Sequence, residues 1–152
     1  MTDALKKAWA EMVQPLLTRP KRLQVAALCY RKEGAAREVL LITSRDTGRW
    51  ILPKGWPIDG LDAPGAALQE AWEEAGVKDG DINTDAIGSF AYEKEMDSGG
   101  IAPVEAKVFS VRVKKMSRSF PESDERTRKW VKPEVAASMV AEPGLQEILR
   151  TL

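Results

Sequence analysis

The sequence contains no histidine and a single cysteine, Cys29, among its 152 residues. Without a second cysteine no disulfide forms within the chain, which is typical of a reducing compartment, so we expect a cytoplasmic protein. Without histidine there is no imidazole to activate a nucleophile or to bind zinc. Ser-His-Asp hydrolases and histidine-ligated zinc enzymes are therefore excluded. We expect Cys29, in the apolar run 25–30, to be a buried small hydrophobe.

The chain also lacks net charge and long apolar runs. Its 23 basic and 23 acidic residues give a formal net charge of zero. A neutral chain has no overall electrostatic attraction for DNA or for an anionic membrane, so neither is expected as a partner. No apolar stretch approaches the roughly 18 residues of a transmembrane helix, and the first residues lack the apolar core of a signal peptide. An anionic ligand must therefore be held by local basic side chains or by a metal.

Length and composition predict one domain over residues 1–152, with 43% hydrophobic and 30% charged residues. Residues 3–13 predict an amphipathic helix within an N-terminal extension, residues 1–20. Its apolar face consists of Leu5, Trp9, Met12 and Val13. The sequence leaves open whether this helix packs on the domain or on a second protomer, and whether the protein is a monomer or a homodimer.

The rest of the chain alternates strand and helix patterns, which predicts an α/β layered domain. Two hairpins are expected, one from each pair of apolar or alternating runs separated by a glycine-containing turn. The expected strands are 23–30, 38–43, 50–52, 87–95, 104–113 and 129–131, the expected helices after residue 100 are 133–140 and 145–152, and a turn is expected at 78–81.

One helix carries an unusual set of charges. Asp62 is a plausible N-cap and Gly76 a plausible terminator, and Glu70, Glu73 and Glu74 fall on one face at i, i+3 and i+4. Like charges at this spacing repel, and no lysine or arginine lies between residues 62 and 77. A hard divalent cation such as Mg²⁺ would relieve the repulsion, whereas the alternative is an acidic solvated face.

The loop before this helix favours the metal interpretation. Residues 54–60 contain two glycines and a proline, which predict a loop between the apolar run 50–52 and the helix. A loop that enters a helix N-terminus presents backbone amides to an anion. Carboxylates and phosphate-compatible groups are therefore expected in one place.

The run from Gly55 to Val77 resembles the Nudix box, G-x5-E-x7-R-E-U-x-E-E-x-G-U with U aliphatic. Glu70, Glu73 and Glu74 take the positions of the motif's last three glutamates without a gap. Two positions depart from the motif, since Leu61 replaces its first glutamate and Gln69 its arginine. Segments 24–31, 39–45, 49–55 and 129–136 resemble the diphosphoinositol polyphosphate phosphohydrolase branch of the Nudix family.

This resemblance implies the Nudix fold, a mixed β-sheet sandwiched between helices. It implies Mg²⁺-dependent hydrolysis, with Mn²⁺ as the alternative metal, of a phosphoanhydride in a diphosphoinositol or diadenosine polyphosphate. The metal ligands and catalytic groups would be Glu70, Glu73 and Glu74, with the Gly55 carbonyl as a further ligand and Glu70 as base. Two alternatives remain open: a Nudix-fold binding or sensor module with little hydrolysis, and an RNA 5′-pyrophosphohydrolase.

Further side chains are candidates for holding substrate or for accepting a proton. Arg45 and Arg49 would grip phosphates, or else be ordinary solvated loop charges. Tyr92, Lys94 and Lys107 would line a substrate face, or else be solvated partners across a hairpin. The candidate substrate-binding residues are Arg22, Arg45, Arg49, Lys54 and Arg126, and the candidate bases outside the box are Glu122 and Glu125.

Overall fold

The computed structural model describes residues 3–4 and 21–152. Most of the helix predicted over residues 3–13 lies outside the described residues. The strands are β1 (Arg22–Glu33), β2 (Ala36–Thr43), β3 (Trp50–Ile51), β4 (Lys54–Gly55), β5 (Val77–Ile82), β6 (Gly88–Glu95), β7 (Ile101–Met116) and β8 (Arg128–Val131). The helices are α3 (Ala63–Ala75), α4 (Pro133–Met139) and α5 (Pro143–Arg150).

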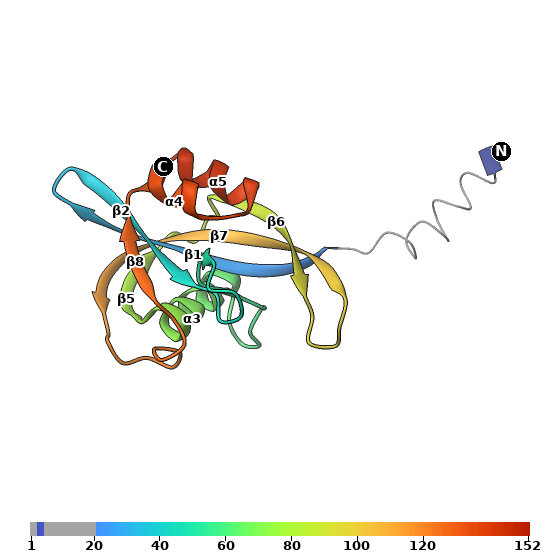
Figure 1. Cartoon of the computed structure of the whole chain (residues 1–152), viewed down its shortest axis with the longest axis horizontal. Helices are drawn as coiled ribbons and strands as arrows, with labels where there is room; N and C mark the ends of the chain where they lie inside the picture. The colour runs from blue at the N-terminus through green and yellow to red at the C-terminus, as the bar shows by residue number, and fades with distance from the viewer. Residues whose placement is uncertain (1–2, 5–20) are drawn as a thin grey trace.

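The described strands form one mixed sheet (Figure 1). Its main path runs β3-β2-β1-β7-β5, while β4 pairs with β1, β6 with β7 and β8 with β2. The pairing of β1 with β7 is parallel, and every other pairing is antiparallel. Both predicted hairpins, β1–β2 and β6–β7, are present.

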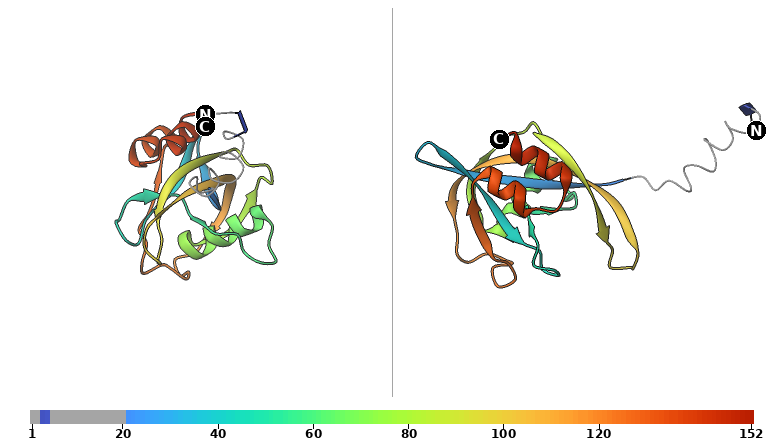
Figure 2. Two further views of the ribbon diagram at one scale, coloured as in Figure 1. Left: turned by 90° about the vertical axis from the view of Figure 1, so that its right-hand side faces the viewer. Right: turned by 45° about the horizontal axis from the view of Figure 1, so that its top comes forward.

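Helices cover both faces of the sheet, with α3 on one side and α4 and α5 on the other (Figures 1 and 2). Alternate residues of the central strands point to opposite faces, so each face has its own core. Ala26, Leu28 and Leu41 lie in the core under α4 and α5, and Ala27 and Leu40 in the core under α3. The predicted fold, a mixed sheet sandwiched between helices, is confirmed. No helix in the described part of the chain is long and apolar enough to cross a bilayer.

The turn predicted at residues 78–81 is wrong, because these residues belong to β5. The strand lies at the end of the sheet's main path and pairs with β7, which explains its polar sequence. The Asp81 carboxylate accepts a hydrogen bond from Arg112 at 2.9 Å. A Cβ on Gly80 would lie 2.8 Å from the Val111 side chain, so here glycine permits close strand packing instead of a turn.

Residues 54–55, predicted as loop, form the short strand β4. Lys54 and Gly55 pair with Ala26 and Val25 of β1, and the Pro53 carbonyl accepts from the Ala27 N–H at 2.9 Å. This pairing anchors the start of the Nudix-like box to the centre of the sheet. It thereby fixes Gly55 opposite the acidic face of α3.

Candidate active site

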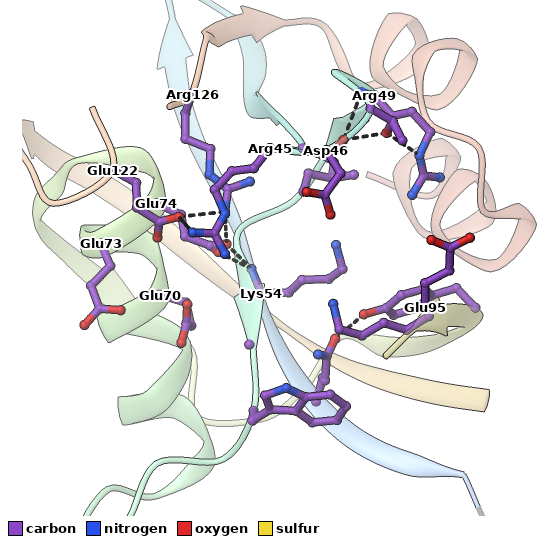
Figure 3. A pocket seen from close by; sticks show the side chains of 18 of the residues that line it. Arg45, Asp46, Arg49, Lys54, Glu70, Glu73, Glu74, Glu95, Glu122 and Arg126 are labelled. Carbon is purple, nitrogen blue, oxygen red and sulfur yellow. Dashed lines mark hydrogen bonds and ion pairs between the residues drawn. The ribbon is translucent and has the colours of Figure 1, made fainter. Parts of the chain in front are cut away.

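A cavity of about 810 Å³ is lined mainly by residues of α3, β4 and β6 and of the segments 44–49, 56–58 and 122–126 (Figure 3). Acidic side chains from α3 line one wall, and basic and acidic side chains are mixed over the rest. The charged lining residues are Arg45, Asp46, Arg49, Lys54, Glu70, Glu73, Glu74, Glu93, Lys94, Glu95, Glu122 and Arg126. The uncharged lining includes Gln24, Trp56 and Tyr92.

Helix α3 begins and ends where the sequence predicts. The Asp62 carboxylate accepts a hydrogen bond from the Gly65 N–H at 2.8 Å, which caps the N-terminus. Gly76 ends the helix in the left-handed conformation with φ of 72°. These two caps set the register that places Glu70, Glu73 and Glu74 on the cavity wall.

Glu74 is the most buried of the three glutamates, with a side chain 5% exposed. Its carboxylate lies 3.2 Å from Nη2 of Arg126, whose side chain is 6% exposed. The same Arg126 nitrogen lies 3.0 Å from Glu122, and Nη1 donates to the Thr43 carbonyl at 2.9 Å. Arg126 was predicted to bind phosphate. In this arrangement its guanidinium is instead occupied by two carboxylates and a backbone carbonyl.

Burial raises the pKa of two glutamates on this wall. The pKa of Glu70 is raised to about 8 by burial and by the neighbouring charges of Glu74, Glu73 and Glu122. The pKa of Glu74 is raised to about 7 by burial, although Arg126 acts in the opposite direction. Burial therefore disfavours the charged form of both carboxyl groups.

Gln69, where the box has arginine, donates a hydrogen bond from Nε2 to the Glu73 carboxylate at 2.8 Å. This contact holds Glu73 beside its own helix, while Glu74 turns toward Arg126. Among the described residues, no three carboxylates are gathered at one point as a ready metal cage. The three glutamates share a wall of the cavity, and rotation of their side chains would be needed for them to bind one ion together.

The donor chemistry of this wall nevertheless fits a hard divalent cation. Mg²⁺ prefers carboxylate and carbonyl oxygens, and Glu70, Glu73, Glu74 and the Gly55 carbonyl supply them. Gly55 also leaves space that any larger residue would fill, since a Cβ there would overlap the Glu70 carboxylate. Burial is the main cause of the raised pKa values of Glu70 and Glu74, and a bound cation would favour the charged form of both carboxyl groups.

Replacing Gly55 by alanine is expected to lower affinity for Mg²⁺ at least about tenfold, a loss of about 1.4 kcal/mol. The added methyl would displace the Glu70 carboxylate, while the flexible side chain can move without unfolding the protein. Titration calorimetry with Mg²⁺ measures the change. Gly88→Ala is the matched control, because its Cβ would meet Ile148 at 3.1 Å, outside the cavity lining. Equal affinities in the two variants would contradict this role for Gly55.

The two candidate bases outside the box are placed differently. Glu122 lines the cavity, with a side chain 19% exposed and in contact with Arg126 and Arg45. Glu125 is 51% exposed, pairs with Arg45 at 3.5 Å, and is not part of the lining. The structure therefore brings Glu122, and not Glu125, to the acidic wall.

Besides Arg126, three of the predicted phosphate-binding residues line the cavity. Arg45 pairs with Glu122 at 3.4 Å, and Arg49 with Glu142 at 3.7 Å, yet both arginine side chains are more than half exposed. The Lys54 ammonium lies 5.2 Å from the centre of the Tyr92 ring, and burial lowers its pKa to about 8. All three remain within reach of a ligand in the cavity.

Arg22 is exposed at the start of β1 and is not part of the cavity lining. Tyr92 and Lys94 do line it, whereas Lys107 lies on a separate hollow. Sequence reasoning missed Gln24, which is 3% exposed and accepts a hydrogen bond from the Tyr92 hydroxyl. The signal available in the sequence was that Gln24 is a polar residue directly before the apolar run 25–30.

Comparison with known proteins supports the family that the sequence motif indicates. A family model described as NUDIX domain matches residues 20–152. Nudix hydrolase 16, mitochondrial, from Arabidopsis thaliana is 29% identical over 121 residues, which cover 78% of this chain and 66% of the relative. Diphosphoinositol polyphosphate phosphohydrolase 3-alpha from Mus musculus is 42% identical over 55 residues, 36% of this chain and 34% of that protein.

The matches with three plant relatives span between 59% and 66% of those proteins' own lengths. Among solved structures, a C. elegans Ap4A hydrolase superposes with a TM-score of 0.65 at 22% identity. That superposition covers 86% of this chain and 95% of the other. The two chains therefore share a fold.

Proposed function

Because the chain belongs to the Nudix family, we propose that it is a Mg²⁺-dependent hydrolase of a phosphoanhydride bond in a polyphosphorylated small molecule. The observation that carries the proposal is the cavity with Glu70, Glu73 and Glu74 on one wall and five basic side chains elsewhere in its lining. A phosphoanhydride has several adjacent negative charges. It therefore needs positive charge from both the metal and the protein.

Glu70, Glu73 and Glu74 would hold the metal, with the Gly55 carbonyl as a further donor. When bound, Mg²⁺ would supply positive charge that offsets the phosphate oxygens and makes water more acidic. Arg49, from the loop before β3, would help to hold the phosphate chain against the wall.

The remaining roles fall to other side chains of the cavity. Lys54 and Lys94 would orient the phosphates that are not cleaved. Both residues line the cavity, where a lysine can bind a phosphate. The proton of the attacking water would pass to a carboxylate, since the chain has no histidine. We assign this role to Glu70, with Glu122 as the nearest alternative outside the box.

For the substrate we rank a diadenosine polyphosphate ahead of a diphosphoinositol polyphosphate. The lining contains five basic and seven acidic side chains, so it offers no surplus of positive charge for a ring with phosphates on every side. Trp56 and Tyr92 offer aromatic surfaces that suit a base. Relatives named for both substrates, an Ap4A hydrolase by fold and a diphosphoinositol polyphosphate phosphohydrolase over 55 residues, support testing the two side by side.

The test measures phosphate or nucleotide release from diadenosine polyphosphates, diphosphoinositol polyphosphates, mononucleotides and 5′-triphosphorylated RNA in the presence of Mg²⁺. We expect turnover of a diadenosine polyphosphate with kcat/KM at least tenfold above that of any other substrate. A preference for the inositol compound would reverse the ranking and leave the hydrolase proposal intact. Tight binding without turnover of any compound would instead support a sensor module. The next step would then be to replace Leu61 by glutamate and Gln69 by arginine, the residues of the Nudix box.

A further inference from the structure

A second, apolar hollow of about 180 Å³ lies beside the first turn of α3, next to the cavity. Leu23 and Val25 of β1 form one side, and the segment before α3 forms the other. Leu23 is 62% exposed and Leu61 is 47% exposed, so two large apolar side chains of the same hollow are open to solvent. The apolar lining is Leu23, Val25, Pro57, Leu61, Ala63 and Ala66.

The hollow is lined in part by Leu61, one of the two positions at which the sequence departs from the Nudix box. The motif has glutamate at this position, but Leu61 lines the apolar hollow and is absent from the acidic cavity. Val25 and Ala66, also in the lining, belong to the core between the sheet and α3. The hollow is therefore an exposed continuation of that core, and leucine at position 61 adds apolar surface to it.

We propose that the N-terminal segment 3–13 docks into this hollow as an amphipathic helix, with Trp9 as the side chain that fills it. The sequence predicts an apolar face on this segment, made of Leu5, Trp9, Met12 and Val13. It connects through residues 14–21 to the start of β1, where Leu23 already lines the hollow. The inference is independent of the proposed hydrolase activity.

Length and volume both agree with this occupant. Eight connecting residues span at most about 29 Å, more than the roughly 16 Å length of an 11-residue helix, so the segment can fold back over the hollow. A cavity of about 150 Å³ holds a benzene ring, so 180 Å³ accommodates much of an indole. Trp9 is the largest side chain on the apolar face of the segment.

Docking of the N-terminal segment would also affect the candidate active site. Gln24 lines both the hollow and the cavity, and so does Pro57. A helix packed on Pro57 would restrict the segment that carries Trp56, which belongs to the cavity lining. The N-terminal segment would therefore stiffen one wall of the substrate cavity without touching the substrate.

The test measures how fast a maleimide modifies a cysteine placed at Leu61 in the full chain. We expect modification of Leu61→Cys at least tenfold more slowly than in the same chain carrying Trp9→Ala and Met12→Ala. Native Cys29 does not interfere, because it is buried and its thiol pKa is raised to about 12. Val135→Cys, at a 44% exposed position on α4, is the control whose rate should not depend on the N-terminal substitutions.

Equal rates at position 61 with and without the N-terminal substitutions would overturn the proposal. Protection that disappears on dilution, together with a dimeric mass, would also overturn it, because a second copy would then cover the hollow. Lys107→Cys provides a second labelling position on the rim if Leu61→Cys does not fold, with the same expected protection. Thermal unfolding of each variant separates loss of docking from loss of the folded domain.

Discussion

Replacing Glu73 by glutamine is expected to lower kcat/KM at least about a hundredfold, a loss of about 2.7 kcal/mol of transition-state stabilisation. The amide keeps the size of the side chain but removes the negative charge that a metal needs. Glu73 is partly exposed on the cavity wall, and its carboxylate accepts a hydrogen bond from Gln69, so the fold should tolerate the change. EDTA should lower the activity of the unmodified protein by at least as much as this substitution does.

The measurement is product release under saturating Mg²⁺, with circular dichroism to verify that the variant is folded. Glu134→Gln is the matched control, since Glu134 is an exposed glutamate in the first turn of α4 and is not part of the cavity lining. Its activity should stay within about twofold of the unmodified protein, a difference of about 0.4 kcal/mol. A variant Glu73→Gln that retains most of its activity would remove Glu73 from the catalytic set.

Replacing Arg126 by methionine is expected to destabilise the metal-free protein by about 3 kcal/mol at pH 8. Removal of one partner from a buried ion pair leaves the remaining charge without compensation. Arg126 contacts Glu74, Glu122 and the Thr43 carbonyl, and only 6% of its side chain is exposed. Denaturant unfolding in EDTA measures the free-energy difference.

The destabilisation should shrink as the pH is lowered. The folded-state pKa of Glu74 is raised to about 7, above its unfolded value of about 4.3, so its burial costs stability as the pH rises through this window. Arg126 opposes that rise, and its removal would push the pKa of Glu74 higher still. Below about pH 5.5 Glu74 is mostly protonated in both proteins, and less of the difference remains.

Arg45→Met is the control for Arg126→Met. Arg45 also contacts Glu122, at 3.4 Å, but its side chain is 58% exposed. Exposed ion pairs contribute at most about 1 kcal/mol, so this variant should lose far less stability. Equal losses in the two variants, or a loss that does not depend on pH, would show that Arg126 does not compensate the buried carboxylates.

The acidic helix could be predicted closely from the sequence because its signals are local. Asp62 and Gly76 act within one turn of the helix ends, and the positions of the glutamates follow from helical periodicity. The partner of Glu74 could not be predicted in the same way. Arg126 lies 52 positions later in the chain, and only the packing of the late loop against α3 brings the two together.

The missed strands have the same physical explanation. Residues 78–81 have the composition of a turn, but pairing with β7 decides their conformation. Lys54 and Gly55 are extended because β1 offers them an antiparallel partner. Where neighbours in sequence determine the structure, the prediction is confirmed. Where pairing with a distant segment determines it, as at residues 78–81 and 54–55, the local pattern predicts the wrong class of element.

The parallel pairing of β1 with β7 also constrains how the chain folds during synthesis. Arg22 pairs with Val104, and these residues are 82 positions apart. At a typical synthesis rate of about 5–20 residues per second, the β1–β2 hairpin would wait several seconds for its central partner. During that interval one edge of an apolar strand has no partner, which favours association with other chains. Slower translation before residue 104 should therefore increase aggregation, and the completed β7 should end this vulnerable period.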